Sequence, residues 1–254
     1  MTRLPGRVAL LVLACAAAGC AHRPADDPAD PLEPVNRVVY TFNETADRYV
    51  LRPVAKGYDT VTPSFLRTGV RNFLDNLFYP TVIANDLLQL KGQMFAQDLS
   101  RFVINTTFGL VGVIDVATPT GLPRNDEDFG QTLGYWGVGE GWYLMLPLLG
   151  PSNNRDFVGR SVDAFTSPLY YVENSTTTIP LSVLNVVSDR ADLLKADRML
   201  EGQLDRYVFV RTIYLQHRQA KVYDGNPPAE EYGFEEEFAA DEAAAAAAED
   251  APAD

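Results

Sequence analysis

The sequence predicts a mainly α protein that carries one small hairpin-like element and ends in a disordered tail. Three observations predict this class. Apolar residues recur close to the 3.6-residue helical period over residues 35–50 and 65–78 and towards residue 221. A single Gly- and aromatic-rich run, residues 133–149, instead fits two short extended arms around a loop. Residues 223–254 are acidic and low in complexity, which is typical of disorder.

The acidic charge of the chain is concentrated at its carboxy-terminal end. The formal net charge is −13, yet residues 222–254 hold eleven acidic residues and no basic one. Residues 21–221 hold 19 basic and 23 acidic residues, so the body is almost neutral. Because the sequence offers no basic stripe that would neutralise the phosphates of a duplex, we do not expect nucleic-acid binding.

The first 19 residues read as a lipoprotein signal peptide. Arg3 and Arg7 precede an apolar run, residues 8–18, which is shorter than the roughly 20 apolar residues that span a bilayer. The run ends in AAGC, which resembles the lipobox at which bacterial lipoproteins are cleaved and acylated. Cys20 is therefore the predicted lipidated amino terminus, and an ordinary cleaved signal is the alternative. Ala21 follows in place of the Asp of an inner-membrane retention signal, so the analogy points to the outer membrane.

Residues 20–33, rich in Pro and Asp, predict a tether to the lipid anchor, and residues 34–222 the folded domain. The first helix is expected to begin near Pro34 and to end or kink at Pro53. Ser64 is the expected cap of the second helix.

Pro80 is expected to interrupt that second helix, after which it resumes. Another amphipathic helix covers residues 93–109, and residues 109–123 read as loop. Residues 182–222 are strongly helical, with Gly202 as the expected break. Helices of this kind either pack into a globular core or lie at a membrane interface, and their periodicity alone does not separate the two uses.

The run LGYWGVGEGWYLMLPLL, residues 133–149, predicts the hairpin-like element. Glycine permits positive φ and close backbone approach, and Pro147 is expected to end the second arm. The glycine spacing matches no phosphate-binding loop and no Lys is present, so nucleotide binding is not expected. On composition, the element is either a buried core hairpin or an apolar surface.

Catalytic and metal chemistry find little support in the residue types present. The mature chain would have a single Cys, which is the lipidated one, and the whole sequence has two His. A zinc site needs several ligands at motif spacing, so we predict no metal and no cofactor. A phospholipid hydrolase would need a nucleophile and a base, and the sequence has no G-x-S-x-G motif; His217 reads as a surface helix residue.

Several long blocks, in order over residues 30–215, resemble the MlaA/VacJ family of outer-membrane lipoproteins. They include DPLEPVNRVVYTFN, RNFLDNLFYPTVIANDLLQ, RFVINTTFGLVGVIDVA and FGQTLGYWGVGEGWYLMLPLLGPSNNRD. The opening block carries the family-motif residues Asn36, Arg37, Tyr40, Phe42 and Asn43. The acidic tail matches no part of that family known to us.

The resemblance implies a ring-like bundle of amphipathic helices in the inner leaflet of the outer membrane, with a channel through the middle. It implies phospholipid passage to a soluble periplasmic lipid carrier, association with a trimeric porin, and maintenance of lipid asymmetry, without enzymatic activity. A structural lipoprotein that braces a porin or an outer-membrane assembly is the alternative. By the resemblance, the lipid path would run at or near residues 133–149, where the candidates are Trp136, Gly137, Gly139, Gly141, Trp142, Tyr143, Leu144, Met145 and Leu146.

Overall fold

The structure, a computed structural model, describes residues 29–228. The signal peptide, Cys20 and residues 229–254 of the acidic tail lie outside the described residues. The described part is mainly helical, as the sequence predicted. Its longer elements are α2 (Glu33–Ala46), α3 (Arg52–Val61), α4 (Ser64–Leu88), α5 (Gly92–Phe108), α6 (Phe129–Tyr135), β1 (Tyr143–Leu146), β2 (Gly150–Asn153), α7 (Asn154–Thr166), α8 (Ser175–Leu193), α9 (Asp197–Glu201) and α10 (Arg206–Val222).

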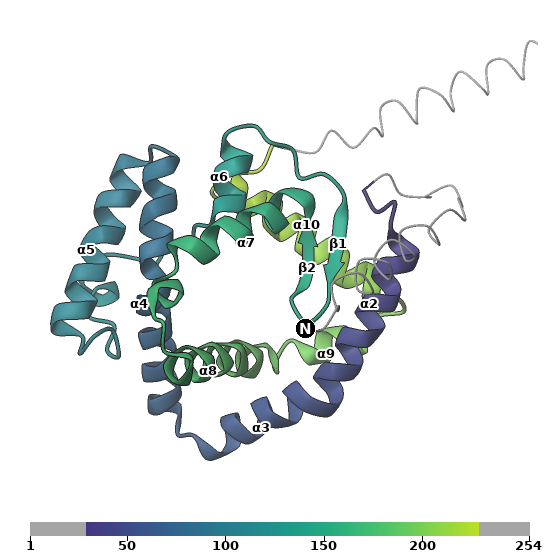
Figure 1. Cartoon of the computed structure of the whole chain (residues 1–254), viewed down its shortest axis with the longest axis horizontal. Coiled ribbons are helices and arrows are strands. Elements are labelled where there is room, and N and C mark those ends of the chain that lie inside the picture. Colours follow the sequence, from purple (N-terminus) through teal and green to yellow (C-terminus); the bar gives the residue numbers. More distant parts are fainter. Residues whose placement is uncertain (1–28, 229–254) are drawn as a thin grey trace, which may run out of the picture.

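The helices are arranged as a ring when the molecule is viewed down its shortest axis (Figure 1). The continuous path of α2 and α3 forms one side, and α8 runs beside α3 (Figure 1). Helix α4 forms the next side and carries α5 on its outer flank, while α6 and α7 lie opposite α8. The β1–β2 hairpin and α10 complete the circuit next to α2 (Figure 1). This agrees with the ring-like bundle implied by the family resemblance.

The prolines interrupt the helices less than the sequence indicated. Helix α2 begins at Glu33, as expected, but Pro53 does not end it, because a π-helical turn, Asp47–Leu51, leads directly into α3. Pro53 lies in the first turn of α3, where a backbone N–H would have no helical partner in any case. Pro80 lies inside the uninterrupted α4, and Ser64 is that helix's first residue rather than its cap.

Two other predictions about the helices are confirmed. Residues 109–123 contain only turns and the short 3-10 turn Thr118–Thr120. Helix α9 ends at Glu201, with Gly202 as its cap, so the predicted break is present. None of the helices within residues 29–228 has the length and apolarity needed to cross a bilayer.

The hairpin is present, but it is displaced along the chain from the expected position. The predicted first arm is helical, because residues 129–135 form α6. The glycine loop therefore precedes the hairpin, and β1 pairs antiparallel with β2, with Tyr143 opposite Asn153 and Leu146 opposite Gly150. Pro147 does end the strand, as expected, and the turn consists of residues 147–149.

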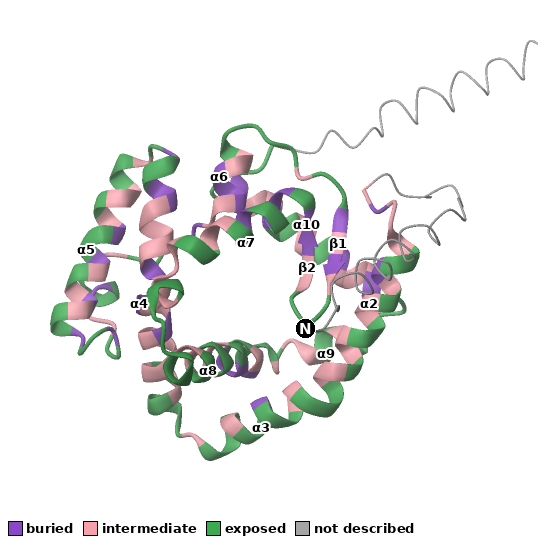
Figure 2. Ribbon diagram, in the orientation of Figure 1, coloured by how far each residue is buried: buried purple, intermediate pink, exposed green. Residues whose placement is uncertain are grey.

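The distribution of apolar residues is the reverse of a soluble globular domain. Among the described residues, ten hydrophobic side chains are buried and nineteen polar or charged ones are, whereas 39 large hydrophobic side chains are exposed. Buried segments occur only as short patches along the ribbon (Figure 2). Helix α5 shows the inversion clearly, since its buried residues are Asp98, Arg101 and Asn105, while Leu99 and Phe108 are exposed.

The buried hydrophobic cluster lies between the hairpin, α2 and α10. Tyr143 and Met145 of β1 pack with Tyr207 of α10, and Tyr40 and Tyr214 pack against them. The rings of Tyr143 and Tyr207 meet edge to face with centroids 6.0 Å apart. This cluster fixes the hairpin against the carboxy-terminal helix.

Candidate functional site

Two asparagines of α2 hold the hairpin. Asn36 is buried; its Nδ2 donates to the carbonyl of Tyr143 at 3.0 Å, and its Oδ1 accepts from the amide of Met145 at 2.9 Å. Asn43 repeats the pattern, donating to the carbonyl of Leu146 at 2.9 Å and accepting from the amide of Leu148 at 2.7 Å. On the side of β1 that β2 does not cover, these backbone N–H and C=O groups thus form their hydrogen bonds with side-chain amides.

The other family-motif residues divide between the two faces of α2. Arg37 donates to Asp205 at 2.7 and 3.2 Å and lies 4.5 Å above the ring of Tyr207, which ties α2 to the start of α10. The hydrogen bond that Arg37 donates to Asp205 is the main cause of a raised pKa for this guanidinium. Tyr40 faces inward, whereas Phe42 is on the outer face and 53% exposed.

A cavity of about 760 Å³ opens beside the hairpin. Helix α2 and the π-helical turn line one wall, and α8, α9 and the start of α10 line the others. From the hairpin, Met145, Gly150 and Pro151 reach it. Its apolar lining also includes Leu200 and Val210, so the cavity is amphipathic rather than purely polar. Its volume lies within the roughly 300–1,000 Å³ of small-molecule sites.

The charged lining of this cavity is organised by Arg190 of α8. Its guanidinium donates to Asp47 at 2.7 and 2.9 Å and to Asp197 at 3.0 and 3.2 Å. Arg52 reaches Asp197 at 2.8 Å and Glu201 at 3.4 Å. These hydrogen bonds and charges raise the pKa of Arg190, so it stays cationic. These pairs join the π-helical turn and the start of α3 to α8 and α9 across the cavity.

The local sequence pattern gives these charged residues no distinguishing mark. Arg190 and Asp197 lie seven residues apart in SVLNVVSDRADLLKAD, a helical stretch that also holds Asp189, Asp192 and Lys195. Charged residues on an amphipathic helix were the available signal, but Asp47, the partner of Arg190 in the π-helical turn, lies 143 residues away.

Of the lipid-path candidates, the structure brings only Met145 to this cavity. Tyr143 is completely buried in the hydrophobic cluster, and Leu144 and Leu146 alternate with it and are half-buried. Trp136 and Trp142 are 53% and 52% exposed, and the indole of Trp136 donates to the carbonyl of Leu88 at 3.3 Å.

The glycine candidates lie on a different side of the hairpin. Gly137 and Gly139 line a second cavity of about 590 Å³, together with residues of α10. Gly137 and Gly141 adopt φ values of +86° and +68°, whereas Gly139 does not adopt positive φ. A Cβ at Gly141 would lie 3.0 Å from the side chain of Asn154, so this position needs glycine for two separate reasons.

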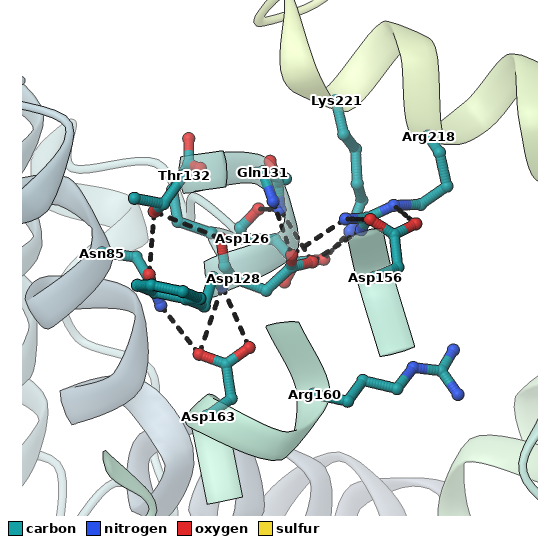
Figure 3. Close-up of polar contacts among 12 residues, drawn as sticks. Asn85, Asp126, Asp128, Gln131, Thr132, Asp156, Arg160, Asp163, Arg218 and Lys221 are labelled. Carbon is teal, nitrogen blue, oxygen red and sulfur yellow. Dashed lines mark hydrogen bonds and ion pairs between the residues drawn. The ribbon is translucent and has the colours of Figure 1, made fainter. Parts of the chain in front are cut away.

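A polar network joins α4, α6, α7 and α10 into a frame for the hairpin. Asp128 caps α6 and accepts from Arg218 at 2.6 and 2.9 Å, and Arg218 also reaches Asp156 of α7 at 3.0 Å (Figure 3). The hydrogen bonds and charge of Arg218 hold the pKa of Asp128 below its usual range, against the opposing effect of burial. Asp163 accepts from the amide of Phe129 at 2.9 Å, which anchors α6 to α7.

Arg160 of α7 points away from that network (Figure 3). Its guanidinium donates instead to the carbonyl of Leu149 at 3.2 Å and to that of Pro151 at 3.0 Å. Those two carbonyls belong to the hairpin turn and to β2. The hairpin is therefore held from both sides, by Asn36 and Asn43 of α2 and by Arg160 of α7.

A buried acidic pair lies where α4, α5 and the segment before α6 meet. Asp86 and Asp98 are fully buried, and Asp98 accepts from the Tyr79 hydroxyl at 2.6 Å and from Asn125 at 2.9 Å. Burial first, and then the hydrogen bond with Asp98, raise the pKa of Asp86 to about 8. Burial beside Asp98 therefore favours the protonated form of Asp86 near neutral pH.

The described residues give no support to metal chemistry. Between residues 29 and 228 no group of His, Cys, Asp and Glu is arranged to hold a metal ion. His217 is exposed on α10, and its pKa is lowered by partial desolvation and by Lys221 and Arg218.

Comparison with known proteins identifies the family. The family model described as MlaA lipoprotein matches residues 28–221. The chain belongs to the MlaA lipoprotein family. An Escherichia coli K12 member, named intermembrane phospholipid transport system lipoprotein MlaA, is 38% identical over 208 residues, or 78% of this chain and 81% of its own. The Haemophilus influenzae MlaA is 34% identical over 85% of this chain and 89% of its own, and an uncharacterised Rickettsia typhi protein is 34% identical over 76% and 78%.

A solved structure supports the MlaA assignment. It is described as "Structural basis for maintenance of bacterial outer membrane lipid asymmetry" and aligns with a TM-score of 0.69 at 35% identity. The alignment covers 76% of this chain and 98% of the other. The ring of helices with a small hairpin is thus the MlaA fold, and the family resemblance inferred from the sequence is confirmed.

Proposed function

We propose that this protein moves phospholipids between the outer membrane and a soluble periplasmic lipid carrier and so maintains outer-membrane lipid asymmetry. The observation that carries the proposal is the inverted surface of the ring in a chain of the MlaA family. Apolar residues of α2 such as Val35, Val38 and Phe42 point outward, while Asn36 and Asn43 of the same helix point to the hairpin. An outward apolar face of this extent favours contact with acyl chains.

The cavity beside the hairpin supports lipid passage rather than attachment alone. It combines apolar side chains with charged ones inside a ring whose outside is apolar. A phospholipid has the same division, because its headgroup is charged and its acyl chains are apolar. The ring would keep the headgroup away from the hydrocarbon of the leaflet, where burying a charge is expensive.

The proposal also includes where the protein is located in the cell envelope and which proteins it binds. Acylation at Cys20, followed by the tether of residues 20–33, would place the domain of residues 34–222 in the inner leaflet of the outer membrane. A trimeric porin is the proposed membrane partner and a soluble periplasmic lipid carrier the proposed acceptor. We expect no catalytic activity.

Lipid content and lipid transfer test the proposal together. Mass spectrometry of the detergent-extracted full-length protein is expected to find co-purified phospholipid. Leu200 lines the cavity from α9, so Leu200→Trp should narrow it and reduce both bound lipid and transfer to the periplasmic carrier.

The neighbouring residue supplies the matched control. Met199 is 61% exposed and does not line the cavity, so Met199→Trp should leave both measurements unchanged. Tight porin binding without any bound lipid would favour the bracing role instead. Equal effects of the two tryptophans would remove this cavity from the lipid path.

A further inference from the structure

The charges that line the cavity beside the hairpin fall into two unequal groups. In the first group, Arg48 and Arg206 share a single carboxylate, that of Glu44, at 3.0 and 2.9 Å. Two guanidinium groups thus face one acid, and the group has a net positive charge. Both arginines are well exposed, with 56% and 39% of their side chains accessible, so they can accept a further anionic partner.

The second group has the opposite balance. Arg190 and Arg52 are shared among the carboxylates of Asp47, Asp197 and Glu201. Three acids therefore face two guanidinium groups, and the group has a net negative charge. Glu201 is its least committed member, because its one ion pair is 3.4 Å long and 60% of its side chain is exposed.

The net charges of the two groups cancel, so the cavity lining as a whole is electrically neutral. All eight charged residues line the same space, together with the apolar side chains of Met145, Leu193, Leu200 and Val210. A ligand with a strong net charge would meet a like net charge in one of the two groups. A ligand that carries one positive and one negative group would find a partner for each.

We propose that this cavity binds the headgroup of a zwitterionic phospholipid. The phosphate would contact Arg48 and Arg206, and the ammonium would contact Glu201. Guanidinium groups suit phosphate because their paired N–H donors match two oxygens. The inference rests on the proposed function and adds a headgroup class to it.

The test measures which lipid the protein selects. Purified full-length protein is incubated with mixed vesicles of equal parts phosphatidylethanolamine and phosphatidylglycerol, and bound lipid is quantified by mass spectrometry. The wild type is expected to enrich phosphatidylethanolamine over the supplied ratio. Glu201→Gln removes the ammonium partner and should shift the bound ratio towards phosphatidylglycerol roughly two- to fivefold, the size that a half-exposed charge contact supports.

A second variant gives a different signature. Both lipids carry the phosphate, so Arg206→Gln should lower the total bound lipid without changing the ratio. Matched controls lie outside the cavity: Glu173→Gln for the acid, and Arg198→Gln, on α9, for the arginine. Both control residues are exposed. Thermal unfolding of each variant confirms that it is folded, which the exposure of Glu201 leads us to expect.

The outcomes separate the inference from the function it rests on. If Glu201→Gln binds the two lipids in the wild-type ratio, the headgroup assignment is wrong while lipid binding stands. If the wild type binds both lipids without preference, the assignment is also wrong. If the wild type binds neither lipid, the proposed function fails and the assignment fails with it.

Discussion

Asn36 and Asn43 lie two helical turns apart on α2, and each holds the backbone of the hairpin through both its amide nitrogen and its oxygen. Seven residues of helix rise about 10.5 Å. The backbone groups that they meet, around Leu144 and Pro147, are three residues apart on a strand, or about 10 Å. The spacing of the two asparagines therefore matches the spacing of the backbone groups they bind, and α2 takes the place of a neighbouring strand on that side of β1.

We predict that removing the inner asparagine unfolds the hairpin more readily. Asn36→Ala leaves the Tyr143 carbonyl and the Met145 amide without partners in a buried position, so the free energy of unfolding should fall by at least about 2 kcal/mol. Denaturant unfolding of the detergent-solubilised protein measures this. Asn185→Ala, which removes only an exposed hydrogen bond to Asp189 within α8, is the control and should cost less than about 0.5 kcal/mol.

Two adjacent aromatics should behave in opposite ways. Tyr143 is fully buried against Tyr207 and Tyr214, so Tyr143→Ala should destabilise the fold by about 3–5 kcal/mol. Trp142 is 52% exposed, and Trp142→Ala should leave thermal unfolding nearly unchanged. Lipid transfer measured on Trp142→Ala then tests its assignment to the lipid path, since a folded variant with normal transfer would remove it.

The glycine loop offers a direct comparison of two substitutions. Gly141→Ala forces an L residue to φ +68° and places its Cβ 3.0 Å from Asn154, so it should cost about 1–2 kcal/mol or more. At Gly139 nothing lies within 4 Å of the added Cβ and φ is not positive, so Gly139→Ala should be close to neutral. Equal unfolding midpoints for the two variants would contradict the loop geometry.

The acidic pair of α4 and α5 predicts a pH dependence. The pKa of Asp86 is about 8 in the folded protein and about 3.8 in the unfolded chain. The folded state therefore binds the extra proton between these values, and the stability this group contributes is complete below pH 4 and lost as pH rises towards 8. The slope is at most about 1.4 kcal/mol per pH unit.

Asp86→Asn keeps a donor to Asp98 without a titrating group, so its stability should not show that decline. The variant should be more stable than the wild type at pH 8 and should approach it at pH 5. The neighbouring ionisable groups, Asp98, Glu127 and Lys91, remain in both proteins. Parallel stability curves for the two proteins across this range would contradict the raised pKa of Asp86. Glu173→Gln, on the surface, controls for a lost carboxylate.

The sequence by itself determined the helical class, the loop at residues 109–123, the break at Gly202 and the family. These follow from local periodicity, from glycine and proline, and from long ordered blocks, all of which are read along the chain. It also predicted a Gly- and aromatic-rich, hairpin-like element within residues 133–149. It did not determine where the hairpin arms lie, because Gly-rich flanks fit both a helix end and a strand end.

Only the tertiary structure decided which face of each helix is inside. Val35, Val38 and Phe42 have the same period whether they face a core or a lipid, and the ring places them outside. The tertiary structure also brought Arg190 to Asp47 and Asn36 to Met145, across 143 and 109 residues of chain. Such pairs leave no local signal, because each partner alone is an ordinary polar residue on an amphipathic helix. The closure of the ring brings Arg190, Asp47 and Met145 to one cavity.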